Sequence, residues 1–333
     1  MKLTIFAFVL AFIGSNCALA QGSYYTDGSP SVVQYRVETE VVFGHGAVLT
    51  DGQEGVKELW MDVYHPLEET AGPRPAIILT YGGSFHRGNP RIPYVGIGAQ
   101  TTTMSQYAQR FASEGYVCFT ITYRVAPDNP VIAPYEGFTE DDLDVEFFKS
   151  QAAITQANII RRQMGLEDVT QETVVPIMKN AVIAAAEDLR KAIRYVKAES
   201  DTFGVDPERI GLLGFSAGAV TTVNVAYGMK EDVAAIVVNS GYPSVFDMDR
   251  LLTDKTEVPP ALFHLAQFDY EVVEMELVPL FGKLDEIGAQ YILSWVPSHG
   301  HFYPSGASTL TSKGERLSVF QGALSFFAEH LRN

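Results

Sequence analysis

The fold is decided by residues 209–227, which read RIGLLGFSAGAVTTVNVAY. The apolar residues before Gly214 indicate a strand buried on both faces, and the residues after Ser216 indicate a helix that follows at once. The residues from Gly214 to Gly218 fit the pattern G-x-S-x-G. The glycines are needed because this turn strains the serine backbone, and side chains two residues away would collide with the neighbouring strand and helix. The stretch predicts a nucleophile, Ser216, at a helix N-terminus. A tight connection without chemistry is the alternative.

Length and composition are typical of one large globular domain. The chain has 333 residues, of which 47% are hydrophobic and 19% are charged. Its net charge of −16 argues against nucleic acid and anionic membrane surfaces as partners, because phosphate groups are bound by concentrated Lys and Arg. No Cys/His cluster has zinc spacing, so we expect no metal site.

The N-terminus has the features of a signal peptide. Lys2 gives a basic start, residues 3–13 are almost wholly apolar, and Ala18-Leu19-Ala20 forms a small-residue cleavage site. We therefore expect residues 1–20 to be removed from an exported protein, periplasmic or secreted. A buried N-terminal helix is the alternative. Later apolar runs are too short to span a bilayer, so stable membrane insertion is not expected. Removal would leave Cys118 as the single cysteine, which we expect in the core.

Strand and helix patterns alternate along the rest of the chain. Strands are predicted at residues 32–43, 57–64, 74–81, 116–123, 210–213, 233–239, 261–265 and 290–296, and helices at residues 106–114, 181–198, 272–287 and 315–331. The first two strands alternate in polarity and should form an antiparallel pair. The later strands are apolar throughout, as in a parallel sheet covered by helices on both faces. We predict an α/β fold with a mostly parallel, doubly wound sheet.

Residues 130–180 do not fit this alternation. They pass through an acidic and aromatic patch into a helical pattern at residues 150–164. So long a connection with its own helix indicates an insertion within the domain formed by residues 21–333. We expect it to act as a lid or pocket wall, or as a purely structural cap.

A serine nucleophile needs a base and an acid that orients the base. Catalytic groups of open α/β sheets collect at the carboxyl ends of strands. His301 follows the last predicted strand and a glycine that lets the loop turn back, so we expect it to be the base, with His299 as the alternative. Asp269 follows the strand at residues 261–265 and gives the chain order Ser, Asp, His that is expected after this elbow.

The sequence alone leaves the identity of the acid open. Asp269 could instead cap the helix that begins near residue 272. The next candidates for the acid are Glu271, Glu274 and Asp247.

The oxyanion that forms during acyl transfer needs hydrogen-bond donors. The strand at residues 74–81 opens onto Gly82-Gly83-Ser84, where small side chains let backbone N–H groups face a bound carbonyl. We expect donors from Gly83 and Ser84, together with the N–H of Ala217 at the start of the elbow helix.

Several motifs together carry a family resemblance: residues 61–66 (MDVYHP), 81–88 (YGGSFHRG), 123–127 (YRVAP) and 214–218 (GFSAG), with Asp269 and His301. On these residues the chain resembles the α/β-hydrolase superfamily. Within it, the chain is similar to the carboxylesterases and lipases related to hormone-sensitive lipase and to bacterial feruloyl-esterase-like hydrolases. The resemblance covers nearly the whole mature chain. It implies Ser216 as nucleophile, His301 as base, Asp269 as its partner, and oxyanion donors from Gly83, Ser84 and Ala217.

Two departures from the family pattern bear on the site. Tyr81 stands where the family usually has the histidine of His-Gly-Gly, and residues 130–180 lengthen a connection that is usually short. The sequence therefore predicts an exported serine esterase that acts on a small-molecule ester without a cofactor. A peptidase or amidase on the same fold is the first alternative, and a non-catalytic protein that binds through the same cleft is the second.

Overall fold

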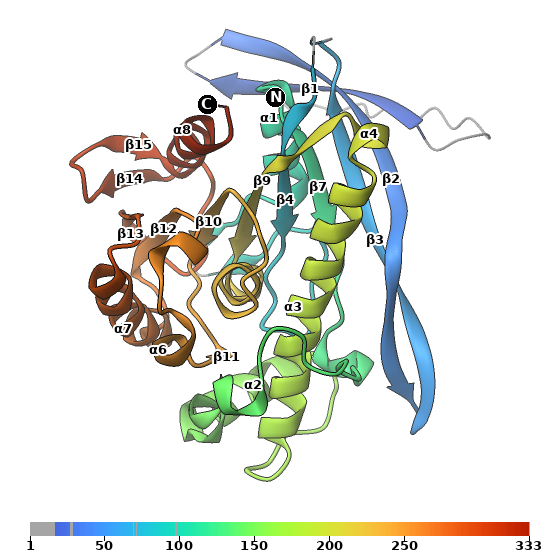
Figure 1. Cartoon of the computed structure of the whole chain (residues 1–333), viewed down its shortest axis with the longest axis vertical. Coiled ribbons are helices and arrows are strands. Elements are labelled where there is room, and N and C mark those ends of the chain that lie inside the picture. Colours follow the sequence, from blue (N-terminus) through green and yellow to red (C-terminus); the bar gives the residue numbers. More distant parts are fainter. Residues whose placement is uncertain (1–16, 27–28, 69, 71, 97–98, 333) are drawn as a thin grey trace, which may run out of the picture.

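A computed structural model describes residues 17–26, 29–68, 70, 72–96 and 99–332. Across these residues, a central sheet of eleven strands forms the middle of the molecule (Figure 1). Its strands, in spatial order, are β1 Cys17–Thr26, β2 Ser29–Thr50, β3 Gln53–Pro66, β7 Val117–Ile121, β4 Arg74–Thr80, β9 Val205–Phe215, β10 Ala235–Asn239, β12 Ala261–Phe268, β13 Tyr291–Gly300, β14 Ser308–Thr311 and β15 Arg316–Ser318. Two further pairs are β5 Val95–Gly96 with β6 Ala99–Gln100, and β8 Leu143–Asp144 with β11 Val245–Phe246.

The strands from β7 to β13 are parallel to their neighbours. They are apolar on both faces because both faces are covered: the β4 residues Ala76, Ile77, Ile78 and Leu79 are all fully buried. Antiparallel strands flank this block, with β2 and β3 on one side and β14 and β15 on the other. The predicted α/β sheet is confirmed, as is the antiparallel pair formed by the first two predicted strands.

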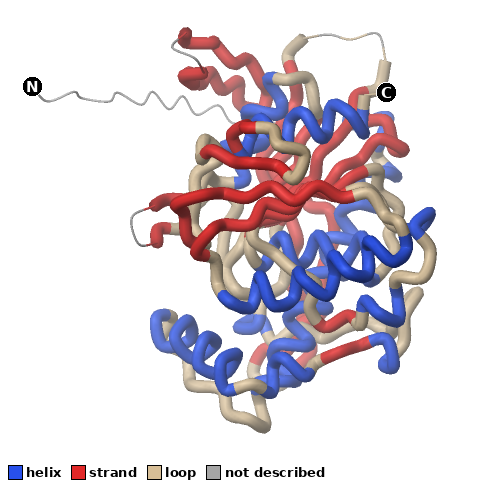
Figure 2. Tube along the Cα trace, turned by 90° about the vertical axis from the view of Figure 1, so that its left-hand side faces the viewer, coloured by secondary structure: helices blue, strands red, loops and turns tan. Residues whose placement is uncertain are grey.

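Helices cover both faces of the sheet (Figure 2). They are α1 Met104–Ser113, α2 Gln151–Gln163, α3 Val174–Ala198, α4 Ser200–Phe203, α5 Ala217–Val223 with a π-helical turn at Asn224–Gly228, α6 Met248–Leu251, α7 Glu271–Ile287 and α8 Val319–Leu331. The helix layers on the two faces of the sheet meet strand β9 from opposite sides. Gly211 faces Phe327 of α8 on one side, and Gly214 faces Gly218 of α5 on the other. On the α8 face, Phe111 of α1 packs against the Phe327 ring with centroids 5.7 Å apart.

Two predicted helix boundaries need correction, and one hairpin was not predicted. The last helix begins at Val319 rather than at residue 315, because Ser318 and Gln321 form a reciprocal capping box there. The residues just before it form β15, which pairs with β14 in a hairpin that was not predicted. Helix α3 begins at Val174, so the end of the predicted insertion, residues 130–180, forms its first turns.

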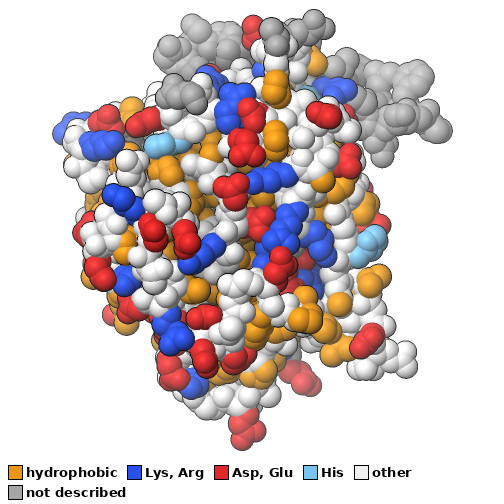
Figure 3. All heavy atoms as spheres, in the orientation of Figure 1, with side chains coloured by type: hydrophobic (Ala, Val, Ile, Leu, Met, Phe, Trp, Pro, Cys, Tyr) orange, Lys and Arg blue, Asp and Glu red, His pale blue; other side chains and the backbone are white. Residues whose placement is uncertain are grey.

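The predicted signal peptide lies largely outside the described residues. Of residues 1–20, the structure describes 17–20, which belong to β1. Among the helices of the described chain, none combines the length and apolar character that a bilayer span requires. Figure 3 shows acidic and basic side chains interspersed over one face of the molecule.

Candidate active site

Ser216 lies in a sharp turn between β9 and α5. Its backbone has φ 54° and ψ −124°, a conformation that residues other than glycine rarely adopt. A Cβ on Gly214 would lie 2.2 Å from the carbonyl oxygen of Gly218, and one on Gly218 would lie 2.1 Å from that of Thr80. The turn is held by the Ser216 N–H, which donates to the Asn239 carbonyl at 2.9 Å. The backbone therefore needs both glycines of the G-x-S-x-G pattern.

Ser216, His301 and Asp269 form one hydrogen-bonded series. His301 Nε2 lies 2.8 Å from Ser216 Oγ, and His301 Nδ1 lies 2.6 Å from Asp269 Oδ1. The sheet register explains this meeting, because Phe268 and Gly300 pair at the ends of the parallel strands β12 and β13. Asp269 follows β12 directly, and His301 follows β13 directly. The structure thus brings together three residues that lie far apart in the sequence.

The carboxylate of Asp269 is buried and accepts two further hydrogen bonds. The Tyr270 N–H donates to Oδ1 at 2.8 Å, and the Ser240 hydroxyl donates to Oδ2. Burial opposes ionisation, but the hydrogen bond and charge of His301 and the hydroxyl of Ser240 outweigh it, so the pKa of Asp269 lies below its usual range. Asp269 is not the cap of α7, whose N-cap residue is Tyr270.

The remaining candidates lie elsewhere. His299 Nδ1 faces the Pro297 carbonyl at 2.9 Å, so His301 rather than His299 is the histidine beside Ser216. Asp247 caps α6 through bonds from the Asp249 and Arg250 N–H groups. Glu271 and Glu274 are in the first turn of α7 with exposed side chains.

The loop after β4 passes directly beside Ser216. A Cβ on Gly82 would lie 2.9 Å from Ser216 Cβ. Gly83 and Ser84 follow with φ 120° and 53°, and a Cβ on Gly83 would meet the Arg87 carbonyl at 1.7 Å, so glycine is required there. In the described chain, the N–H groups of Gly83, Ser84 and Ala217 donate no hydrogen bond to another residue. They are available to a ligand oxygen.

Tyrosine hydroxyls brace this loop in the absence of the family histidine. Tyr123 donates to the Tyr81 carbonyl at 2.9 Å, and its ring stacks on Tyr81 with centroids 4.4 Å apart. Tyr94 donates to the Gly82 carbonyl at 2.6 Å. Burial raises the pKa of Tyr94, which keeps its phenol protonated and able to donate. Tyr94 and Ser240 were both missed by the sequence reasoning.

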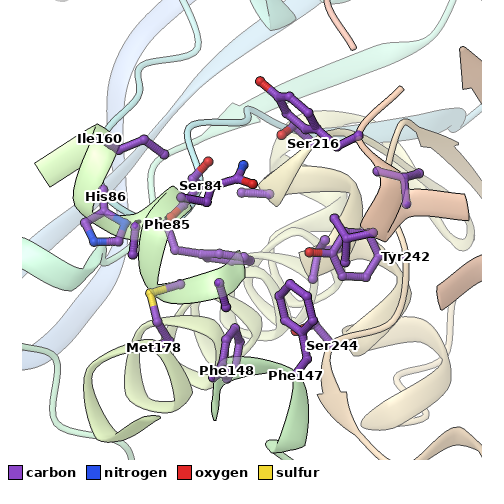
Figure 4. A pocket seen from close by; sticks show the side chains of 18 of the residues that line it. Ser84, Phe85, His86, Phe147, Phe148, Ile160, Met178, Ser216, Tyr242 and Ser244 are labelled. Carbon is purple, nitrogen blue, oxygen red and sulfur yellow. Dashed lines mark hydrogen bonds between the residues drawn. The ribbon is translucent and has the colours of Figure 1, made fainter. Parts of the chain in front are cut away.

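Two cavities meet at Ser216. The smaller has a volume of about 90 Å³ and is mostly apolar, and the larger has a volume of about 590 Å³ and is more polar. Figure 4 shows Ser216 and Ser84 on one side of the smaller cavity, with Phe147, Phe148 and Met178 on the other. These last three residues belong to the predicted insertion, which therefore forms a wall of the pocket.

The described residues contain no group of three or more His, Cys, Asp or Glu side chains that could hold a metal ion. Cys118 is buried in β7, and burial raises the pKa of its thiol. It lies in the core, as the sequence predicted.

Comparisons with known proteins agree with this geometry. The family model BD-FAE matches residues 176–249, which include Ser216. Chlorogenic acid esterase from Aspergillus niger is 45% identical over 62 residues, which make up 18% of this chain and 12% of that protein. The match therefore spans about an eighth of that relative's length.

One solved structure shares the fold over most of the chain, and a second is reported beside it. A truncated carbohydrate esterase from gut microbiota aligns with TM-score 0.52 at 16% identity, covering 89% of this chain and 96% of that one. Thermogutta terrifontis esterase 2, phosphorylated by paraoxon, aligns with TM-score 0.49 at 17% identity, covering 88% and 92%. The sheet, with the sharp serine turn after β9, has the α/β-hydrolase fold. Part of the chain is therefore similar to the BD-FAE family and to a chlorogenic acid esterase.

Proposed function

We propose that the protein is an exported serine hydrolase that cleaves carboxylic esters through an acyl-enzyme. The observation that carries the proposal is the hydrogen-bonded series of Ser216, His301 and Asp269 beside a strained serine turn. Esterase names among the relatives support the same reaction class.

In the first half of the reaction, Ser216 Oγ attacks the ester carbonyl carbon and its proton passes to His301 Nε2, 2.8 Å away. The free N–H groups of Gly83, Ser84 and Ala217 would stabilise the oxyanion. The bond to the alcohol oxygen then breaks, and His301 returns the proton to that oxygen. The products are an acyl-enzyme on Ser216 and a free alcohol.

In the second half, water gives a proton to His301 and attacks the acyl carbon. The bond to Ser216 breaks, Ser216 Oγ takes up the proton from His301, and the carboxylic acid leaves. Asp269 holds His301 by its Nδ1 and remains ionised at neutral pH, since its pKa lies below the usual range. The cycle needs no cofactor.

The test is labelling with a fluorophosphonate probe, followed by mapping of the labelled peptide. The folded protein should be labelled at Ser216 and should hydrolyse p-nitrophenyl acetate, and Ser216→Ala should lose both properties. A folded wild-type protein without label would contradict the hydrolase proposal and favour a binding protein. Faster turnover of p-nitroanilides than of esters would favour an amidase or peptidase instead.

Export is proposed from the sequence alone, on the basic start, apolar run and Ala-Leu-Ala site of residues 1–20. Expression of the full chain in a bacterium, followed by fractionation and N-terminal sequencing, tests it. The expected product begins at Gln21 outside the cytoplasm. A cytoplasmic product that retains residues 1–20 would contradict the proposal.

A further inference from the structure

Two peptide groups meet at Gly83, and each carries one of the N–H groups expected to face the oxyanion. The peptide between Gly83 and Ser84 carries the Ser84 N–H. Its carbonyl oxygen accepts bonds from the His86 and Arg87 N–H groups at 3.1 and 3.3 Å. The backbone of the loop itself therefore holds this peptide.

The peptide between Gly82 and Gly83 is held by side chains instead. Its carbonyl oxygen accepts bonds from the phenols of Tyr94 at 2.6 Å and Tyr123 at 3.2 Å, and from no backbone N–H group in the described chain. The Tyr123 hydroxyl lies closer to the Tyr81 carbonyl, at 2.9 Å. A phenol has one donor hydrogen, so Tyr94 is the main donor to the Gly82 carbonyl.

This restraint matters because glycine stands on both sides of the peptide. A residue without Cβ rotates about its backbone bonds at little steric cost, so Gly82 and Gly83 alone leave the peptide plane free to turn. The peptide unit is planar and trans, so its N–H points away from its C=O. A bond that fixes the Gly82 carbonyl therefore fixes the direction of the Gly83 N–H. Donors to the carbonyl also polarise the amide, which strengthens its N–H as a donor.

Tyr94 is itself firmly placed. Its N–H donates to Thr101 Oγ1, and the Thr101 N–H donates to the Tyr94 carbonyl, each at 2.9 Å, beside the β5–β6 pair. The Tyr94 hydroxyl is closely packed, since a Cβ on Gly88 would lie 2.5 Å from it and one on Gly83 would lie 3.0 Å from it. The phenol therefore has little room to move away from the Gly82 carbonyl.

On these contacts, and resting on the proposed function, we propose that Tyr94 is a positioning residue for the oxyanion hole. Its phenol holds the Gly82 carbonyl and so aims the Gly83 N–H at the oxyanion that forms on the substrate. The ester oxygen gains its negative charge only as Ser216 attacks, so this bond acts in the transition state. Loss of the phenol lowers kcat and leaves binding of the ester unchanged.

The first test is steady-state hydrolysis of p-nitrophenyl acetate by Tyr94→Phe, which removes the hydroxyl and keeps the ring. Loss of a whole oxyanion donor costs on the order of a hundredfold to a thousandfold in rate. Tyr94→Phe leaves the Gly83 N–H in place and Tyr123 near the carbonyl, so kcat should fall about tenfold, with KM within about twofold of wild type.

Tyr227→Phe is the matched control. Tyr227 is fully buried, donates to the Pro259 carbonyl at 3.3 Å and lines neither cavity at Ser216. Both variants lose one bond from a phenol to a backbone carbonyl, so urea unfolding should show similar, small losses of stability. The kcat of Tyr227→Phe should stay within about twofold of wild type.

A pair of inhibitors separates aim of the N–H group from general loosening of the site. With a butyl trifluoromethyl ketone, Ser216 Oγ bonds to the carbonyl carbon, the carbonyl electron pair moves to oxygen, and His301 takes the proton. The butyl methyl ketone has the same chain but forms no stable adduct. The ratio of the methyl ketone Ki to the trifluoromethyl ketone Ki should fall about tenfold in Tyr94→Phe, as kcat does, and should not change in Tyr227→Phe.

Three results would overturn the inference while wild type is still labelled at Ser216. They are equal effects on kcat in Tyr94→Phe and Tyr227→Phe, a rise in KM in place of a fall in kcat, or an unchanged inhibitor ratio in Tyr94→Phe. Absence of labelling and of all ester hydrolysis in wild type would instead refute the proposed function.

Discussion

Removal of the Ser240 hydroxyl should slow the reaction without unfolding the protein. Ser240 follows the last residue of β10 and is 1% exposed. Its hydroxyl donates to Asp269 Oδ2, the carboxylate oxygen that His301 does not contact, and lies 3.2 Å from the Tyr303 hydroxyl. Ser240→Ala keeps Cβ, so it leaves the backbone strain at φ 52° unchanged and removes the donor alone.

The magnitude follows from the charge on the acceptor. A hydrogen bond to a charged group contributes about 1.5 to 3 kcal/mol. Asp269 keeps the bonds from His301 at 2.6 Å and from the Tyr270 N–H at 2.8 Å, so we expect the lower end of this range. About 1.4 kcal/mol corresponds to tenfold in rate, so Ser240→Ala should lower kcat about tenfold.

The assay is steady-state hydrolysis of p-nitrophenyl acetate over a range of pH. We expect KM to be unchanged, because Ser240 would orient Asp269 rather than bind substrate. The pKa of Asp269 is held down partly by Ser240, so the acid limb of kcat/KM should shift to higher pH in the variant. Ser244→Ala is the control, since Ser244 lines the same cavity but does not contact Asp269. A kcat for Ser240→Ala within twofold of wild type, or an unshifted acid limb, would refute the reasoning.

Three further predictions concern the base, the core and acid stability. His301→Ala should lower kcat for p-nitrophenyl acetate by on the order of a thousandfold, whereas kcat of His299→Ala should stay within about threefold of wild type. Equal losses of turnover in the two variants would count against His301 as the base. Arg124→Met should cost about 3 to 5 kcal/mol in urea unfolding, because it leaves the fully buried Asp188 carboxylate without its ion-pair partner, and a loss below about 1 kcal/mol would contradict this. Burial and the nearby charge of Arg36 lower the pKa of His65 to about 4, against about 6.5 when unfolded. The unfolded state therefore binds the extra proton between these values, and stability should fall by about 2 kcal/mol from pH 8 to pH 5 on account of His65 alone. Urea unfolding of His65→Phe at the two pH values should show a correspondingly smaller fall, and an identical fall would contradict the assignment.

Much of the fold could be predicted because local pattern and burial agree. The strand at β4 is apolar at successive positions, and the structure buries it on both faces. The same reasoning failed at β14 and β15, where the strands are short and only one face is buried, as Thr309 and Leu310 illustrate. A short hairpin at the edge of a sheet is stabilised by pairing between its two strands, and the polarity pattern of one strand alone does not reveal that pairing.

The positions of site residues could be predicted where the ends of strands could be placed along the chain. Asp269 and His301 each follow a strand, and the parallel register of β12 and β13 makes them neighbours. Ser240 also follows the carboxyl end of a strand, β10, where catalytic groups collect. It was missed because an uncharged serine does not stand out as a candidate in the sequence. Tyr94 could not have been found in this way. It reaches the Gly82 carbonyl from a loop outside the sheet, and only the tertiary structure sets that contact.

The residues at the end of β10 contact both the nucleophile and the acid. The Asn239 carbonyl accepts the Ser216 N–H at 2.9 Å, and the next residue, Ser240, donates to Asp269. Both Ser216 and Ser240 have positive φ, and each directly follows one of the paired strands β9 and β10. Strand β10 lies between β9, which leads into Ser216, and β12, which leads into Asp269. A shift of β10 would therefore move the nucleophile and the acid at once. Substitutions that loosen β10 should therefore lower activity more than their cost in stability predicts, whereas equally destabilising substitutions in β15 should not.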